Sequence, residues 1–481
     1  MPIGAGLEKL EAYLNQNKER HIERIQSVIR QPSVSTEDHG VKECAQLINE
    51  IHKDVGFHEA EIIQTGGLPG LWGYYDAGAP KTIVVYSNFD TRPVLPHEVW
   101  EHDPYSATLT SMGGFDRVLV GRGSYSYKGP YIAWLNALEA LIAVDGTLPV
   151  NVITLIEGDE ILGSPYYREM INKYRDRISK ANASLSPGAS QAPNGNVTMT
   201  MGYKGMIYAE MSAGGGRWDR GPQGGPTHGM TKSILDSPVW RLVHALSSLT
   251  EVNGNKVNVD GFYDQLVPVT DQERQEAMDY WKSMGSGAWN KLFPVGTAQH
   301  NVSDLSDEET ILNFFYGPSF NINGIKGGFT GPGTLPFSLP HEASARFDIR
   351  IPRGYKAKPV VDGIRRHLDR MGYQDVEFNA MGAFDPSKQD ESSDLVRSLH
   401  KAFATMEVPL ITPPGSGGGG PWSIFTTEFG MPMIRSVGVG VGGGTGGPNE
   451  YMVIDGKGPA GGLVECELSH MHILKAYAEE N

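Results

Sequence analysis

An acidic run follows one of the most apolar segments of the chain. The stretch NVITLI (151–156) leads into Glu157, Asp159 and Glu160, and the run stops at Ile161. Carboxylates at the end of a buried strand are typical of a metal site or of general acid–base chemistry. Ile161 stands just where one more acid would complete a metal-binding pair.

Two other short segments carry residue types that can do chemistry. Asn88 and Asp90 follow the apolar run TIVVYS (82–87), and Ser126, Tyr127 and Lys128 place a hydroxyl, a phenol and an amine in succession. Backbone N–H groups in the glycine-rich segment that includes Gly418 and Gly419 could bind an anion. The alternative is that these glycines only allow tight turns.

The elements around these residues predict an α/β fold. Apolar strands at 82–87 and 151–156 alternate with a helix at 130–144, which favours a doubly wound, mainly parallel sheet. Ligands of such sheets bind beyond the carboxyl ends of the strands. We therefore expect Asn88, the acidic run and the loop 438–450 to meet in one crevice.

The middle of the chain has a different pattern. GYKGMIYAEMSA and HEASARFDIRIP alternate apolar and polar residues, as half-exposed strands do, and they bracket helical stretches at 237–250 and 357–371. The pattern predicts an inserted α+β domain at 206–384. Residues 1–205 and 385–481 then form one discontinuous α/β domain.

Composition excludes several function classes. The net charge of −15 argues against a general nucleic-acid binder. The two cysteines, Cys44 and Cys466, form no CxxC motif, which argues against a disulfide framework and against a cysteine zinc site. No run approaches the roughly 20 apolar residues of a membrane span. We expect a cytoplasmic protein with no membrane segment and no cofactor.

Motifs in a fixed order then resemble one family, the dinuclear-zinc peptidases that include carnosine dipeptidases, aminoacylases and glutamate-releasing carboxypeptidases. The matching stretches are VVYSNFDTRPV, LVGRGSYSYKGPYIAWLNALEAL, IEGDEILGSP, MGYKG, GFYD, NINGIKGGFTGPG, ARFDIRIP, GSGGGGPWSIF and GGPNEYM. The resemblance covers nearly the whole chain. It implies an inserted ferredoxin-like lid that also carries a dimer contact, so a homodimer is expected.

The five zinc ligands of that family are all replaced in this sequence. Their positions fall at Asn88, Ser126, Ile161, Ser186 or Pro187, and Gly446. Zinc binds imidazole, carboxylate or thiolate, usually four groups per ion, and none of these residues supplies one. An acid left at 161 without a cation would be a buried charge costing several kcal/mol. The resemblance therefore implies that no metal is held here.

Other family positions keep their chemistry. By resemblance, Glu160 is the general base, Asp90 orients a neighbour, and His228 is the lid histidine that reaches a partner subunit's site. Arg350 falls in the lid region that contacts a substrate carboxylate. Each also has a structural alternative: a hydrogen-bonded relic for Glu160 and Asp90, a surface histidine for His228, and a salt bridge for Arg350.

The segment 126–128 leaves two alternatives open. Ser126 and Tyr127 either fill the space that the metal vacated or act in catalysis, with Ser126 as a nucleophile. Lys128 is normally structural in the family, but Ser126, Tyr127 and Lys128 could also form a hydroxyl–phenol–amine relay. We assign Lys128 and Asn88 to substrate binding together with Arg350, Gly418 and Gly419.

Three functions remain. The first is a metal-independent enzyme that hydrolyses or transfers the acyl group of a small amino-acid-derived or amide substrate, with Glu160 as general acid/base. The second is a non-hydrolytic proton-transfer enzyme, such as a lyase, cyclase or isomerase. The third is a non-catalytic small-molecule-binding protein. With the metal positions neutral, we expect no cation beside Glu160 and therefore a raised pKa of its carboxyl group.

Overall fold

The computed structural model describes residues 8–285, 288, 298, 300–328, 330–331 and 337–480. The chain divides into two compact units. Unit 1 comprises residues 1–201, 389–413 and 424–481, and unit 2 comprises residues 202–388 and 414–423.

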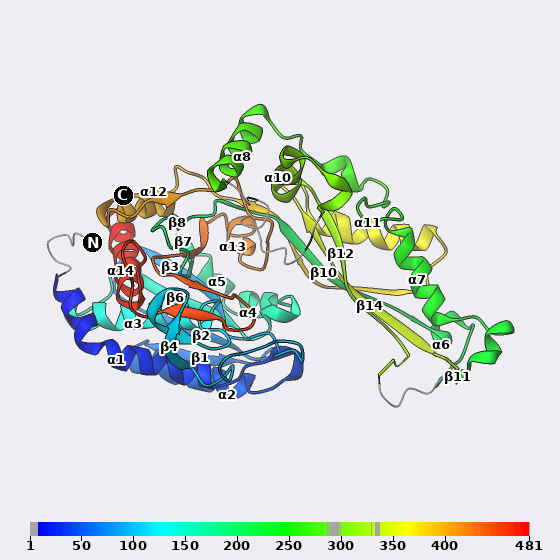
Figure 1. Ribbon diagram of the computed structural model, residues 1–481, viewed down its shortest axis with the longest axis horizontal. Helices are drawn as coiled ribbons and strands as arrows, with labels where there is room; N and C mark the ends of the chain where they lie inside the picture. Colours follow the sequence, from blue (N-terminus) through cyan, green and yellow to red (C-terminus); the bar gives the residue numbers. More distant parts are fainter. Residues whose placement is uncertain are drawn as a thin grey trace. The chain divides into compact units, whose positions relative to one another are not determined.

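The core of unit 1 is a six-stranded, mainly parallel sheet (Figure 1). Its strand order is β1-β2-β6-β3-β7-β18. Strands β6, β3, β7 and β18 are parallel, whereas β2 at one side of them pairs antiparallel with both β6 and the edge strand β1. The strands are β1 (Glu59–Ile63), β2 (Gly70–Tyr75), β3 (Thr82–Asn88), β6 (Asn151–Glu157), β7 (Ala183–Pro187) and β18 (Met433–Val437). The predicted α/β sheet is confirmed.

Helices cover both faces of this sheet. On one face the buried side chains of Ile83 and Val85 join a large core with α1 (Glu8–Arg30), α2 (Val41–Val55), α3 (Lys128–Asp145), α12 (Asp394–Thr405) and α14 (Leu463–Glu479). On the other face Tyr86 meets Tyr167 of α4 (Tyr167–Lys173) edge to face. Successive strand residues point to opposite sides, so fully apolar strands such as β3 require both layers.

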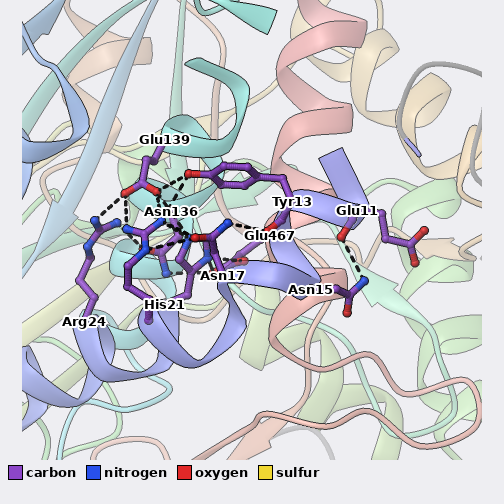
Figure 2. Close-up of polar contacts among 10 residues, drawn as sticks. Glu11, Tyr13, Asn15, Asn17, His21, Arg24, Asn136, Glu139 and Glu467 are labelled. Atoms are coloured by element: carbon purple, nitrogen blue, oxygen red, sulfur yellow. Dashed lines mark hydrogen bonds and ion pairs between the residues drawn. The ribbon is translucent and has the colours of Figure 1, made fainter. Parts of the chain in front are cut away.

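A polar network fastens α1 to α3 and α14 (Figure 2). The Nδ1 atom of the buried His21 ring lies 3.0 Å from a carboxylate oxygen of Glu467, and its Nε2 lies 3.7 Å from one of Glu139. Arg24 pairs with the same Glu139 at 2.5 Å. Burial opposes the imidazolium, but the two carboxylates outweigh it and raise the pKa of His21.

The remaining elements of unit 1 are short. A second sheet of order β19-β20-β5-β4 contains β4 (Thr108–Met112), β5 (Phe115–Val120), β19 (Gly442–Gly443) and β20 (Tyr451–Val453). The others are α5 (Arg175–Ile178), α13 (Ser423–Thr427), β8 (Val197–Thr198) and β17 (Leu410–Ile411).

Unit 2 contains a four-stranded antiparallel sheet with two helices packed into its core, the ferredoxin-like arrangement (Figure 1). The chain runs β10 (Gly205–Gly214), α7 (Pro238–Ser248), β12 (Ser319–Gly327), β14 (Glu342–Ile351), α11 (Ala357–Arg370) and β15 (Glu377–Phe384), and the sheet order is β12-β14-β10-β15. On β10 the buried residues are every second one, including Ile207, Ala209 and Met211. The predicted α+β insertion is therefore observed as a ferredoxin-like fold.

Unit 2 has additional elements outside that sheet. They are α6 (Gly215–Trp218), α8 (Asp271–Met284), α10 (Asp307–Tyr316), β9 (Gly202–Tyr203), β11 (Thr227–His228), β13 (Ser338–Leu339) and β16 (Ser387–Lys388). Helices α8 and α10 pack on each other through Trp281, Ile311 and Phe315. Across the described part of the chain, no helix combines the length and apolarity needed to cross a bilayer.

Candidate active site

The carboxyl ends of four adjacent strands place polar residues from distant segments side by side. Asn88 lies opposite Glu157 in the β3–β6 ladder, and Arg435 lies opposite Ser186 in the β7–β18 ladder. Because β7 also pairs with β3, these four residues end neighbouring strands of one sheet. Of the expected crevice residues, the structure thus brings Asn88 and the acidic run to the same sheet edge.

Asp90 connects this edge to the turn that carries Glu160. Its Oδ2 accepts hydrogen bonds from the Ser35 hydroxyl at 2.7 Å and the Ile161 backbone N–H at 2.9 Å. Its Oδ1 accepts from the Asn88 amide at 3.0 Å. Burial raises the pKa of the fully buried Asp90 carboxyl, while these hydrogen bonds oppose the rise. This geometry makes Asp90 a positioning residue for the 160–162 turn.

The acidic run is deeply buried before it reaches Glu160. Glu157 accepts from the Tyr86 hydroxyl at 2.7 Å and from the Ser164 hydroxyl at 3.0 Å, while its Oε2 has no hydrogen-bond partner. Burial, followed by the negative charges of Asp159 and Glu160, raises the pKa of Glu157 well above its usual value. Burial likewise raises the pKa of Asp159 to about 7. Burial therefore favours the protonated form of the Glu157 and Asp159 carboxyl groups.

Glu160 is half-buried, and its charge acts on two phenols. Its negative charge contributes, after burial, to raising the pKa of Tyr86 well above its usual value and that of Tyr127 to about 12. Both phenols therefore stay protonated at neutral pH. Glu160 is thus a carboxylate within electrostatic range of two aromatic hydroxyls.

Arg435 is a residue of this cluster that the sequence analysis missed. Its Nη2 donates to the Tyr127 hydroxyl at 3.0 Å, and its positive charge acts on the same two phenols as Glu160. The sequence analysis expected no cation beside Glu160; the structure brings the Arg435 cation to the same two phenols. The available signal was a lone charged residue in the apolar strand segment MPMIRSVGV (431–439).

Ser126 and Lys128 are engaged in internal hydrogen bonds. The Ser126 backbone N–H donates to Glu450 at 2.7 Å, and the Ser126 hydroxyl bonds to the same carboxylate oxygen. The buried Glu450 also accepts from the Gly123 N–H at 3.0 Å. The Lys128 ammonium is buried and donates to the Gln31 carbonyl at 2.7 Å, and burial lowers its pKa. These contacts favour the structural alternative for Lys128.

The donor set does not fit the family's metal pair. The Asn88 amide bonds Asp90, the Ser126 hydroxyl bonds Glu450, and Ile161 and Gly446 have no ligating atom. Within the described ranges, no group of three or more His, Cys, Asp or Glu side chains is arranged to hold a metal ion. We therefore derive no chemical step through zinc.

The other predicted site residues belong to unit 2. Arg350 donates to Asp348 at 2.9 Å and to the Gly419 carbonyl at 3.3 Å. The Gly418 N–H donates to the Ser416 hydroxyl at 3.0 Å, so this amide is used within the turn. Exposed His228 lies on β11, which pairs with β13 beyond the Glu342 end of β14, whereas Arg350 lies at the opposite end of that strand. The structure therefore groups Arg350 with the glycines but not with His228.

Comparison with protein families gives one match over most of the chain. The model described as Peptidase family M20/M25/M40 matches residues 84–460. A Cys-Gly metallodipeptidase of Candida albicans is 26% identical over 384 residues, which cover 75% of each chain. The human Beta-Ala-His dipeptidase is 30% identical over 296 residues, covering 60% of this chain and 53% of that protein.

Solved structures show the same fold. The dipeptidase Dug1p of Saccharomyces cerevisiae superposes with a TM-score of 0.79 at 20% identity, covering 99% of this chain and 100% of that one. An M20 family metallo-carboxypeptidase of Sulfolobus solfataricus gives a TM-score of 0.78 at 24% identity, covering 95% and 99%. At these identities the likeness establishes the fold alone.

Proposed function

Because this chain belongs to Peptidase family M20/M25/M40, as the sequence motifs predicted, we propose that it is a hydrolase-like enzyme that works without a metal. Its substrate is a small amino-acid-derived or amide molecule. The dipeptidase names of the relatives support a substrate of dipeptide size. Glu160 acts as the general acid/base in hydrolysis or acyl transfer.

The hydrogen bond from the Ile161 N–H to Asp90 is the observation that carries this proposal. It holds the Glu160 turn against the end of β3 although the side chains at 88 and 161 cannot bind zinc. A carboxylate kept in place, half-exposed and next to protonated phenols, has the reach and the proton donors that acid–base catalysis needs.

The chemistry limits which substrates are reasonable. Glu160 would remove a proton from water or from an attacking group, and the neighbouring phenols can donate hydrogen bonds. Water activated by a carboxylate alone is a weaker nucleophile than a metal-bound hydroxide. An activated acyl group therefore suits this site better than an ordinary peptide bond.

The test is Glu160→Gln, assayed on dipeptides, N-acyl amino acids and activated esters of the same size. We expect turnover to fall by about 10²–10⁴-fold with substrate affinity nearly unchanged, because Gln keeps the shape but exchanges no proton. Glu43→Gln on the exposed face of α2 is the matched control. Normal turnover in Glu160→Gln would refute the base assignment.

A proton-transfer enzyme is the second candidate, and the buried acids favour it. Burial raises the pKa of Asp159, one residue from Glu160, to about 7, and it raises the pKa of Glu157, three residues away, well above its usual value, so both carboxyl groups favour keeping a proton. Solvent deuterium incorporation into a substrate that is not cleaved would select this alternative. Binding with neither cleavage nor exchange would leave a non-catalytic binding protein.

We also propose a homodimer formed through the predicted lid/dimerisation domain, 206–384, with His228 reaching a neighbouring subunit. Large apolar side chains in this region are strongly exposed: Trp240 is 57%, Met230 75%, Ile234 81% and Phe337 75% exposed. Such a group favours a protein–protein interface. Light scattering at micromolar concentration should give twice the chain mass, and Ile234→Asp should shift it to one chain mass; a wild-type monomer would refute the proposal.

A further inference from the structure

Arg435 occupies an unusual position for a charged residue. It lies in β18 between Ile434, which is fully buried, and Ser436, opposite Ser186 of β7. A guanidinium in such a half-buried strand costs desolvation energy unless it gains an interaction in return. By the family resemblance, one metal-ligand position falls at Ser186 or Pro187, so Arg435 brings a permanent positive charge to that strand end.

Tyr127 joins Arg435 to a second vacated ligand position. The guanidinium donates to the Tyr127 hydroxyl at 3.0 Å, and its centre lies 5.4 Å from the Tyr127 ring centroid. Tyr127 directly follows Ser126, the second position. The Tyr127 hydroxyl accepts this hydrogen bond. Among the described residues, no acceptor is found for the proton of that hydroxyl.

These two groups are suited to one kind of ligand. A guanidinium stays charged at all working pH values and presents a planar fork of N–H donors to paired oxygens. A protonated phenol beside it adds a donor on the same side. Donors fixed by the protein need little reorganisation, so an oxyanion placed between them is stabilised effectively.

We propose that Arg435 and Tyr127 form an oxyanion-binding site at the position of the family's metal pair. The oxyanion is either the ligand's own carboxylate or the oxyanion that develops on an attacked acyl carbon. The inference deepens the proposed function, but its binding arm needs no turnover.

The binding arm uses N-acetylglycine and its neutral analogue N-acetylglycinamide as probes. Uniform 3-fluorotyrosine labelling gives a ¹⁹F signal for Tyr127, assigned by its loss in Tyr127→Phe. We expect N-acetylglycine to shift this signal saturably, and Arg435→Met to weaken binding by about 10- to 100-fold, as for loss of a charged hydrogen bond. Arg175→Met, which removes a surface pair with Glu428, is the control and should bind normally.

The two probes separate the two sources of the oxyanion. Tighter binding of N-acetylglycine than of the amide assigns the site to a ligand carboxylate. Equal binding of both, with turnover lost in Arg435→Met, assigns it to the developing oxyanion. Arg435→Lys keeps the charge but not the fork and should show an intermediate loss.

Binding to Tyr127→Phe, which lacks the ¹⁹F reporter, is measured by isothermal titration calorimetry. The proposal is overturned if Arg435→Met and Tyr127→Phe match the Arg175→Met control in both calorimetric binding and turnover. Tyr127→Phe keeps the cation, so it remains informative if Arg435→Met fails to fold. Arg435-dependent binding with turnover unaffected by Glu160→Gln would retain this site and reject the proposed general base. Loss of turnover in Glu160→Gln with no effect of Arg435 would do the reverse.

Discussion

Replacing Asp159 by Asn should make the protein more stable at neutral pH than the wild type. The Asp159 side chain belongs to a residue only 2% exposed, and burial raises its pKa from the ordinary 3.8 to about 7. Above pH 3.8 the unfolded chain releases this proton while the folded chain keeps it. The wild type therefore loses stability as pH rises from about 4 to about 7, and the Asn variant does not.

The size of the effect follows from that pKa interval. One pH unit of carboxyl shift corresponds to about 1.4 kcal/mol, so an interval of about three units sets an upper limit of about 4 kcal/mol. Removing the Asp159 charge also relieves Glu157, which acts in the same direction. The variant should gain about 1.4 kcal/mol per pH unit over the wild type between pH ~5 and ~7, and nothing further above pH ~8.

The assay is urea unfolding followed by tryptophan fluorescence at pH 5, 6, 7 and 8. Asp54→Asn on the exposed surface of α2 controls for the loss of one acid. A stability difference between Asp159→Asn and the wild type that stays constant across this range would contradict the reasoning. So would a wild type that gains on the variant as pH rises.

Three further predictions concern other parts of unit 1. His21→Gln should destabilise the protein most below pH ~6.5, and the loss should shrink as pH rises through the raised pKa of His21; melting curves at pH 6 and 9 test this, and a pH-independent loss would contradict it. Chelator treatment should leave the melting temperature and any turnover unchanged, and elemental analysis should find well under one zinc per chain; one or two ions, lost on changing Asp90 or Glu160, would disprove this. Ser126→Ala should retain turnover if Glu160 is the base, whereas inactivity with a normal Glu160→Gln would support the hydroxyl–amine relay.

The order of motifs along the sequence was sufficient to predict the family and the fold. Local patterns located β3 and β6, because a strand buried on both faces is a continuous apolar run. They also located β10 and β14, because a strand buried on one face alternates apolar and polar residues. Helix α12 begins at Asp394, a few residues after the chain returns to unit 1 at residue 389. Gln389 is held outside it by tertiary hydrogen bonds, from its own N–H to the Met201 carbonyl and from the Met433 N–H to its side chain.

The sequence also determined that Asn88, Ser126, Ile161 and Gly446, where the resemblance puts zinc ligands, carry no imidazole, carboxylate or thiolate, since the identity of a side chain fixes whether it can bind a metal. It could not determine what stands in their place. Arg435 and Tyr127 are 308 residues apart, and Asp90 and the Ile161 N–H are 71 apart. Such pairs depend on which strands become neighbours and which way each side chain points, and no local pattern encodes either. The electrostatics of the site, with the half-buried Arg435 and Glu160 acting on the same phenol and with the raised pKa of Asp159, was therefore decided by the tertiary structure alone.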